Sequence, residues 1–318
     1  MLDRATYDIS RRSLLRAGAG LGVGLLAGLG GSGRVLAAEK PKFKTVNEGV
    51  ITIAMSGVMP VTGFKDGKIT GSDAEMIVAI AEKLGLGVKP NIMAWAATVE
   101  SIRSGRADIM CGDMGWTVPR ANAMLLTDEI YYGTNFVTMK KSMPFNGTFN
   151  VNDAKGYSVG SGTGYSYVPD IKKIPGVKEV KLYDSVDACV RDVLAGRLDL
   201  AVLDSMTVDY MLLQNPNLDL KQVPVTPNDQ YPHLSGKGHA VMGMSLDNPD
   251  LFDAVNAGVK WLWRTKKNAE LLKENGMTSP SYLEKSEKNP RIGVDRDEKG
   301  NILGPAAHTP KDFSALFA

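Results

Sequence analysis

The most constraining feature of the sequence is a ten-residue pattern that occurs twice. Residues 104–113 and 195–204 share Gly-Arg-x-Asp, and each copy has a second Asp five positions after the first. The pattern predicts a helix that ends at the Gly, which takes a left-handed cap without strain, followed by an apolar strand. Each strand would carry its last residue, Asp113 or Asp204, to its carboxyl end, where open α/β sheets bind ligands. The alternative is a common helix-to-strand connection with two solvated carboxylates.

Strand and helix patterns alternate along the chain. A β-branched run at 50–55 is followed by turn residues at 65–68, and Ser72 and Glu75 have the spacing of a helix capping box. The alternation then continues through 88–92, 98–103, 107–111, 136–139, 158–160, 186–194 and 198–203. It predicts an α/β fold with mainly parallel sheets covered by helices. Since 318 residues exceed one average domain, we expect two lobes.

The first 37 residues have the organisation of an export signal. Arg11 and Arg12 precede an apolar, Gly-rich stretch at 17–31, and Val-Leu-Ala-Ala follows at 35–38, with small residues where a signal peptidase would cut. This arrangement predicts a cleaved signal peptide, and the adjacent arginines resemble the twin-arginine export signal. The alternative is a membrane anchor, but the apolar stretch is shorter than the roughly 20 residues that a span needs. We therefore expect a soluble, periplasmic mature protein.

Composition excludes several classes of function. The formal net charge is +2, and it becomes −1 once residues 1–37 are left out. A near-neutral body offers no electrostatic basis for binding nucleic acid. The three His and two Cys lack metal-ligand spacing, and Gly160, Gly162 and Gly164 lack dinucleotide spacing. We expect neither metal nor cofactor, and two buried thiols instead of a disulfide.

The ordered motifs resemble a known family. They are similar to the amino-acid-binding periplasmic proteins of ABC importers over about residues 48–283, through the segments 60–73, Trp95, 104–108, 114–120, 128–132, 156–165 and 196–204. The resemblance implies a type II clamshell that holds its ligand in a cleft, acts as a monomer and delivers the ligand to an inner-membrane ABC permease. It implies a first lobe over 38–139 plus 238–285 and a second lobe over 140–237. Residues 286–318 lie beyond it and are expected to form an irregular extension.

The resemblance also assigns candidate ligand contacts. Arg120 stands where the family pairs with the ligand α-carboxylate, and Asp204 stands where it receives the α-ammonium. A guanidinium suits this role because it offers two parallel donors and keeps its charge when desolvated. The alternatives are a surface arginine and a solvated strand-end carboxylate.

Other candidates include departures from the family pattern. Gly115 replaces a hydroxyl residue near the carboxylate site, although Thr117 and the Gly115 N–H remain. Asp113 replaces a small or hydroxyl residue, and a second carboxylate near Asp204 would favour a cationic ligand group. The remaining candidates are the apolar walls Trp116 and Phe64 and, in the Gly-rich loop of the second lobe, Thr163 and Tyr165. Such aromatic residues are more often core, and such loops are often ordinary turns.

Two functions follow from this reading. The first is a solute receptor that makes and breaks no bond. The second is an enzyme on the same scaffold, similar to periplasmic cyclohexadienyl dehydratases, which needs a positioned general acid. Asp113 is the candidate acid, but no neighbour in the sequence activates it. The receptor is therefore the preferred prediction, and no catalytic residue is assigned.

Overall fold

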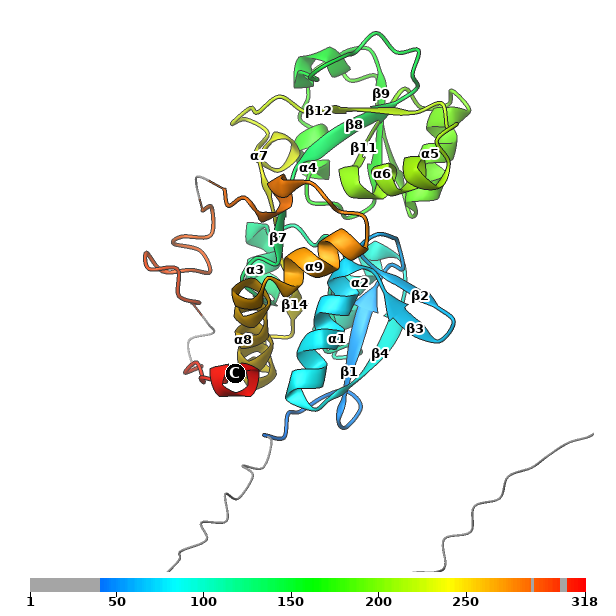
Figure 1. The fold of residues 1–318 in the computed structure, drawn as a ribbon. Coiled ribbons are helices and arrows are strands. Elements are labelled where there is room, and N and C mark those ends of the chain that lie inside the picture. The colour runs from blue at the N-terminus through cyan, green and yellow to red at the C-terminus, as the bar shows by residue number, and fades with distance from the viewer. Residues whose placement is uncertain (1–40, 287–288, 304–307) are drawn as a thin grey trace, which may run out of the picture. The chain divides into compact units, whose positions relative to one another are not determined.

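The computed structural model describes residues 41–286, 289–303 and 308–318 (Figure 1). The leader predicted for residues 1–37 lies outside the described residues. No helix in the described ranges has the length and apolar character needed to cross a bilayer.

The first sheet has the strand order β4-β1-β5-β14-β6. Its strands are β1 (Val50–Met55), β4 (Gly87–Ile92), β5 (Ile109–Met110), β6 (Leu125–Leu126) and β14 (Gly243–Met244). β1 is parallel to β4 and β5, whereas β14 is antiparallel to β5 and β6. The helices of this lobe are α1 (Ser72–Leu84), α2 (Trp95–Arg103), α3 (Val118–Ala123), α8 (Pro249–Thr265) and α9 (Lys267–Glu274).

The second sheet repeats this plan with the order β10-β9-β11-β8-β12. Its strands are β8 (Asn135–Met139), β9 (Ser158–Gly162), β10 (Glu179–Tyr183), β11 (Leu200–Asp204) and β12 (Lys221–Pro224). The helices are α4 (Val168–Ile171), α5 (Val186–Leu194), α6 (Ser205–Gln214) and α7 (Pro232–Ser235). β9 is parallel to β10 and β11, and β8 is antiparallel to β11 and β12.

Two sequence expectations are corrected here. Each sheet is mixed instead of mainly parallel, because β14 in the first sheet and β8 in the second run against their neighbours. β8 was expected at the end of the first lobe, but its pairing with β11 and β12 places it in the second sheet. The first crossing between the sheets therefore lies before residue 135.

The two crossings are paired with each other. β7 (Tyr131–Gly133) and β13 (Gly238–Ala240) form a two-stranded antiparallel ribbon between the lobes, with Tyr132 opposite His239 (Figure 1). A separate hairpin joins β2 (Gly63–Lys65) to β3 (Lys68–Thr70), and its turn was predicted from the sequence.

The repeated pattern forms the same local structure in both lobes. Gly105 follows the end of α2 and Gly196 follows the end of α5, with φ of 66° and 71°. The first Asp of each copy caps the neighbouring strand: Asp108 accepts from the Thr52 N–H at 2.7 Å and Asp199 accepts from the Ser158 N–H at 2.8 Å. The prediction that the chain uses one helix-to-strand unit twice is therefore confirmed.

The capping box predicted at the start of α1 is wrong. The residue before the helix is Gly71, and no side chain caps it. Ser72 and Asp73 are fully buried, and Glu75 accepts a hydrogen bond from Asn275 instead of capping its own helix. The predicted end of α1 is correct, because Gly85 takes the left-handed cap with φ of 75°.

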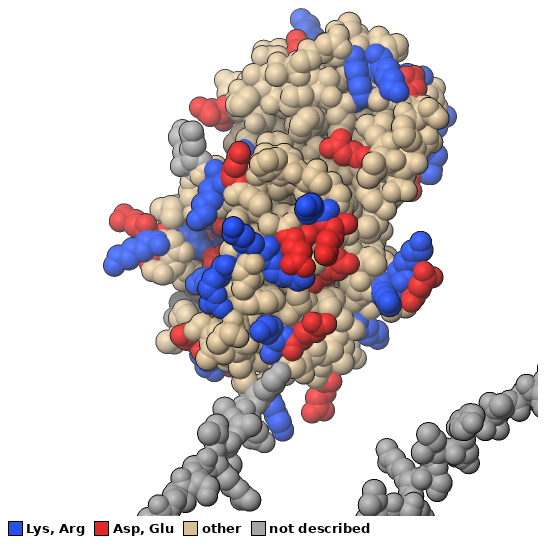
Figure 2. Space-filling model, viewed as in Figure 1, with Lys and Arg blue, Asp and Glu red and all other residues tan. Residues whose placement is uncertain are grey.

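The C-terminal extension is irregular in the residues that are described, apart from a 3₁₀ turn at Ser314–Phe317. It is nevertheless packed onto the first lobe. Phe317 is buried in the same core as α1 and α8, and Arg291 is fully buried. Acidic and basic side chains are interspersed over the visible face of the molecule (Figure 2). Cys111 and Cys189 are both buried and unbonded.

Candidate functional site

A pocket between the two lobes gathers the second Asp of each repeated unit. Asp113 follows β5 in the first lobe and Asp204 ends β11 in the second, and both line one pocket. Further lining residues come from both lobes and include Trp95, Arg120, Tyr165 and Tyr167. The sequence prediction that Asp113 and Asp204 meet at one cleft is therefore confirmed.

A second pocket continues the cleft toward the β7–β13 ribbon. It shares Asp113, Ser166, Tyr167 and Asp204 with the first pocket. Its other walls come from β13 and from segments next to it, and include Gly115, Trp116, His233, Lys237, His239 and Pro290. We call this the hinge-side pocket. Together the two pockets offer a solute one continuous charged site.

Arg120 is held at the cleft by the N-terminal turn of α3. Thr117 caps this helix, and its hydroxyl accepts from the Arg120 N–H at 3.3 Å. The guanidinium donates to the carbonyl of Gly115 at 2.5 Å and to the carbonyl of Gly164 at 3.0 Å. It also lies 5.5 Å from the centre of the Trp95 ring. Because Gly164 belongs to the second lobe, Arg120 connects the two lobes across the cleft.

Asp73 fixes the position of Asp113. The Asp73 carboxylate accepts from the Asp113 N–H at 2.8 Å, from the Gly112 N–H at 3.2 Å and from the Tyr131 hydroxyl at 3.3 Å. These bonds hold the turn after β5, where Asp113 takes a positive φ of 49° that non-glycine residues rarely adopt. The sequence analysis did not select Asp73 as a site residue, because the segment 72–75 was interpreted as a helix capping box.

The carboxyl groups of Asp73, Asp113 and Asp204 share a desolvated environment that disfavours their ionised forms. Burial raises the pKa of Asp73 to about 6. Burial, followed by repulsion from Asp204 and Asp73, holds the pKa of Asp113 well above its usual range, although Arg120 acts against this. Burial also raises the pKa of Asp204, against the hydrogen bond that the Tyr167 hydroxyl donates to it at 3.0 Å. Burial lowers the pKa of Arg120 to about 10, so it remains charged at neutral pH.

The remaining predicted residues divide into two groups. Tyr165 lines the first pocket, and Gly115 and Trp116 line the hinge-side pocket. Phe64, Thr163 and Thr117 line neither pocket. Phe64 is 47% exposed on the β2–β3 hairpin, and the Thr163 hydroxyl donates to Asp184 at 3.2 Å. Thr117 acts through the cap that positions Arg120.

Two backbone N–H groups of the Gly-rich loop in the second lobe are bonded within that lobe. The Thr163 N–H donates to the Tyr183 carbonyl at 2.8 Å, and the Tyr165 N–H donates to the Gly162 carbonyl at 3.2 Å. The loop instead presents the Gly164 carbonyl to Arg120. It also leads to Ser166 and Tyr167, two lining residues that the sequence analysis did not select although they follow the loop directly.

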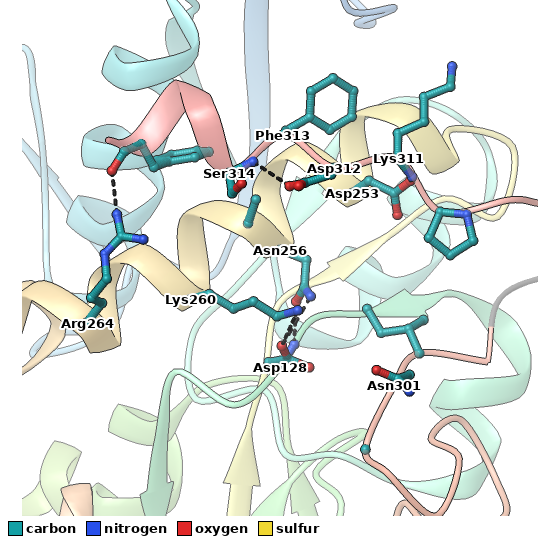
Figure 3. Close-up of a pocket in the computed structure, with 15 residues that line it drawn as sticks. Asp128, Asp253, Asn256, Lys260, Arg264, Asn301, Lys311, Asp312, Phe313 and Ser314 are labelled. Atoms are coloured by element: carbon teal, nitrogen blue, oxygen red, sulfur yellow. Dashed lines mark hydrogen bonds and ion pairs between the residues drawn. The ribbon is translucent and has the colours of Figure 1, made fainter.

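A larger open pocket lies away from the cleft. It measures about 1290 Å³ and lies between α8 and the C-terminal residues (Figure 3). Its charged groups already have protein partners: Asp128 contacts Lys260 and Asn256, and Arg264 donates to the Phe317 carbonyl. None of the residues predicted to bind ligand lines it, so the cleft between the lobes is the candidate site.

Two α/β lobes joined by a pair of strands, with a buried charged pocket between them, define a solute-binding protein of the type II class. The sequence profile of the bacterial extracellular solute-binding proteins, family 3, matches residues 51–277, and the chain belongs to this family. The predicted family and the predicted two-lobed α/β fold are therefore confirmed.

Individual relatives are moderately similar. The L-cystine-binding protein TcyJ of Escherichia coli (strain K12) is 26% identical over 75% of this chain and 86% of its own length. "Probable amino-acid-binding protein YxeM" of Bacillus subtilis (strain 168) is 25% identical over 55% of this chain and 66% of its own length, just under two thirds. A solved substrate-binding protein of an amino acid ABC transporter has a TM-score of 0.63 and 24% identity, covering 71% of this chain and 99% of that one. These relatives are solute-binding proteins rather than enzymes.

Proposed function

We propose that this protein is a periplasmic receptor for an amino acid or a related small solute that carries a cationic group, and that it delivers this solute to an inner-membrane ABC permease. The observation that carries the proposal is that Asp113 and Asp204, from different lobes, line one buried pocket together with Arg120. A solute held between these groups would contact both lobes at once, which is what a clamshell receptor requires.

The charge of the pocket favours a cationic group. Asp73 is fully buried, Asp113 and Asp204 are partly buried at the pocket wall, and Arg120 is the cation that lowers the pKa of both Asp113 and Asp204. An ammonium or guanidinium group between Asp113 and Asp204 would replace the water that their ionised forms lose on burial. Trp95 and Tyr165 add aromatic faces next to this position, and such faces also attract cations.

Arg120 would receive a solute carboxylate. A guanidinium has five N–H donors, and the two carbonyl bonds of Arg120 leave donors free for a ligand. A carboxylate at Arg120 and an ammonium at Asp113 and Asp204 would together recognise the α-carbon substituents of an amino acid. The relatives TcyJ and YxeM carry amino-acid-binding names, which support the same solute class.

The export route and the oligomeric state are also part of the proposal. Arg11 and Arg12 in the leader favour export by the twin-arginine system before the leader is removed. We also propose a monomer that uses no cofactor and no nucleic acid, since the solute site is completed by the two lobes of one chain.

A dehydratase-like enzyme is the second candidate, because the raised pKa of Asp113 would suit a general acid. The same shift is expected of a carboxyl that awaits a cationic ligand, and the relatives are receptors.

Mass spectrometry of the purified protein distinguishes these candidates. The protein is isolated from its periplasm without added ligand, examined intact, and then denatured to release bound small molecules. We expect one intact amine-bearing solute per chain in the wild type and less than a tenth of that amount in Asp204→Asn, by analogy with losing a buried charged partner. Turnover of a prephenate-like acid, or a bound solute without a cationic group, would contradict the proposal.

A further inference from the structure

The C-terminal extension contributes a wall to the solute cleft. Pro290 lines the hinge-side pocket, which also contains Asp113, Tyr167 and Asp204. The family match ends at residue 277, so this wall is made by a segment outside the matched region. The position of Pro290 depends on its neighbour Arg291, because that side chain is fully buried and anchors the segment.

The buried guanidinium of Arg291 donates hydrogen bonds to the backbone and to two carboxylates. Its guanidinium donates to the carbonyls of Leu126 and Thr127 at 3.1 and 2.8 Å, immediately before the first crossing between the lobes. It also makes two bonds to the Asp295 carboxylate, at 2.6 and 3.1 Å, and one to Glu129 at 3.2 Å. A planar guanidinium in such a set of acceptors has one allowed orientation.

Glu129 links Arg291 to His239 in the crossing strand β13. The same Glu129 oxygen that accepts from Arg291 lies 3.0 Å from Nδ1 of His239. His239 is in β13, stacks edge-on against Tyr132 of β7, and lines the hinge-side pocket. The ribbon formed by β7 and β13 has only three residues in each strand, and short two-stranded ribbons are marginally stable without further support. Backbone bonds between residues 114–116 and 239–241 support β13 on one side, and Glu129 and Arg291 add a side-chain anchor to it.

We propose that residues 289–296 are a functional part of the solute site, in which Arg291 acts through Glu129 and His239 as a positioning residue for the hinge-side wall. The proposal rests on the proposed receptor function, but its structural step can be tested without a solute. In this arrangement the geometry of the pocket depends on an extension that lies beyond the family match.

The extension provides its own matched control. Arg296 is 2% exposed, lies in the same segment and contacts the same Asp295. It donates to the Leu126 carbonyl and to Asp128, both at 3.0 Å, and does not contact Glu129 or His239. Arg291→Gln and Arg296→Gln therefore both remove a buried guanidinium from the extension, but only Arg291→Gln breaks the link to β13.

Amide hydrogen exchange of the full exported chain, followed by mass spectrometry, measures the effect. We expect exchange in peptides covering β7 and β13 to be at least about 10-fold faster in Arg291→Gln than in wild type, with β1 unchanged as an internal reference. Arg296→Gln should leave the ribbon peptides within about twofold of wild type, and Arg291→Lys should be intermediate because the charge next to Glu129 remains. Equal acceleration in Arg291→Gln and Arg296→Gln, or none in Arg291→Gln, would overturn the proposal.

A second variant covers the case in which Arg291→Gln does not fold. Glu129→Gln keeps the extension anchored to Asp295 and to the two carbonyls but weakens the link to His239. It should accelerate exchange in β13 but not in residues 289–303, whereas unchanged β13 exchange would also overturn the proposal.

A binding experiment distinguishes a failure of this inference from a failure of the proposed function. Melting temperatures are measured for wild type, Arg291→Gln and Arg296→Gln with each of the twenty standard L-amino acids and L-cystine. We expect the affinity for any probe that stabilises wild type to fall about 10-fold or more only in Arg291→Gln, and an equal loss in both variants would contradict the positioning role. If no probe stabilises wild type, the proposed solute class fails. Hydrogen exchange then still decides whether Arg291 positions the ribbon formed by β7 and β13.

Discussion

The cleft combines one guanidinium, that of Arg120, with the carboxylates of Asp73, Asp113 and Asp204. Asp73 has a structural role, because it accepts hydrogen bonds from the backbone N–H groups of Gly112 and Asp113 and so fixes the turn that carries Asp113. Asp113 and Asp204 line the pocket from opposite lobes, and Arg120 bridges the lobes through Gly164. The residues proposed to recognise a solute therefore come from both lobes, and Arg120 also bonds across the cleft.

Replacing Arg120 should greatly weaken solute binding. Truncating one partner of a buried charged pair costs about 2 to 5 kcal/mol, so Arg120→Ala should bind its solute about 30-fold to 3,000-fold more weakly. Arg120→Lys should remain impaired, because an ammonium lacks the two-pronged geometry. Calorimetric titration with the solute identified by mass spectrometry measures this, and the exposed Arg106→Ala serves as control. Wild-type affinity in a folded Arg120→Ala protein would mean that the solute has no carboxylate at this position.

Replacing Asp113 should stabilise the empty protein and weaken binding. The folded-state pKa values of Asp73, Asp113 and Asp204 lie above the unfolded value of about 4, so the folded protein holds extra protons there. Stability of the ligand-free wild type should consequently fall as pH rises above about 4, until these groups are ionised. Asp113→Asn removes the Asp113 part of this penalty and should melt higher at neutral pH with a weaker pH dependence.

The solute should show the opposite trend. A cationic group binds the ionised carboxylates and releases protons, so wild-type affinity should rise with pH over the range in which stability falls. Melting curves and titrations across this range test both trends. A lower melting temperature of Asp113→Asn at neutral pH would show that the Asp113 carboxylate stabilises the empty pocket.

Among the elements, the repeated helix-to-strand unit explains why the two lobes deliver equivalent residues to one cleft. In each unit a left-handed glycine ends the helix, and the first Asp holds the neighbouring strand through its backbone N–H. The second Asp then emerges at the end of the strand. The C-terminal extension is built differently, since its described residues form little regular structure and it is held by buried side chains such as Arg291 and Phe317.

The last turn of the extension should contribute strongly to stability. Phe317 is 1% exposed and packs on Trp261 with ring centres 5.9 Å apart. Phe317→Ala should lower the free energy of unfolding by about 3 to 5 kcal/mol, the usual cost of truncating a buried aromatic residue. Leu303→Ala, at a side chain that is 48% exposed, should change it by less than about 0.5 kcal/mol. Equal midpoints of the two variants in urea would show that the extension is not part of the core.

At the scale of the whole molecule, the proposed receptor function requires that the mature chain reach the periplasm. Arg11→Lys combined with Arg12→Lys should leave the precursor in the cytoplasm, because the adjacent guanidinium pair is what the twin-arginine system reads. Cell fractionation with an antibody against the mature protein measures this, and the single Arg16→Lys variant serves as control. Normal periplasmic amounts of the double variant would indicate an ordinary secretory route.

The sequence by itself determined the features that depend on short-range rules. Helix ends at Gly85, Gly105 and Gly196, the turn at 65–68 and the repeated unit all follow from backbone preferences of residues close together in the chain. Together with the family resemblance, they were enough to predict the two-lobed α/β fold and the meeting of Asp113 with Asp204.

Only the tertiary structure decided the features that depend on long-range contacts. Asp73 contacts the Asp113 backbone from 40 positions away, and Arg291 contacts Leu126 from 165 positions away. The antiparallel strands, the exposure of Phe64 and the burial of the extension likewise depend on which distant segment each residue packs against. No local pattern encodes such a partner, because desolvation and charge coupling are set by every group that surrounds a side chain once the chain has folded.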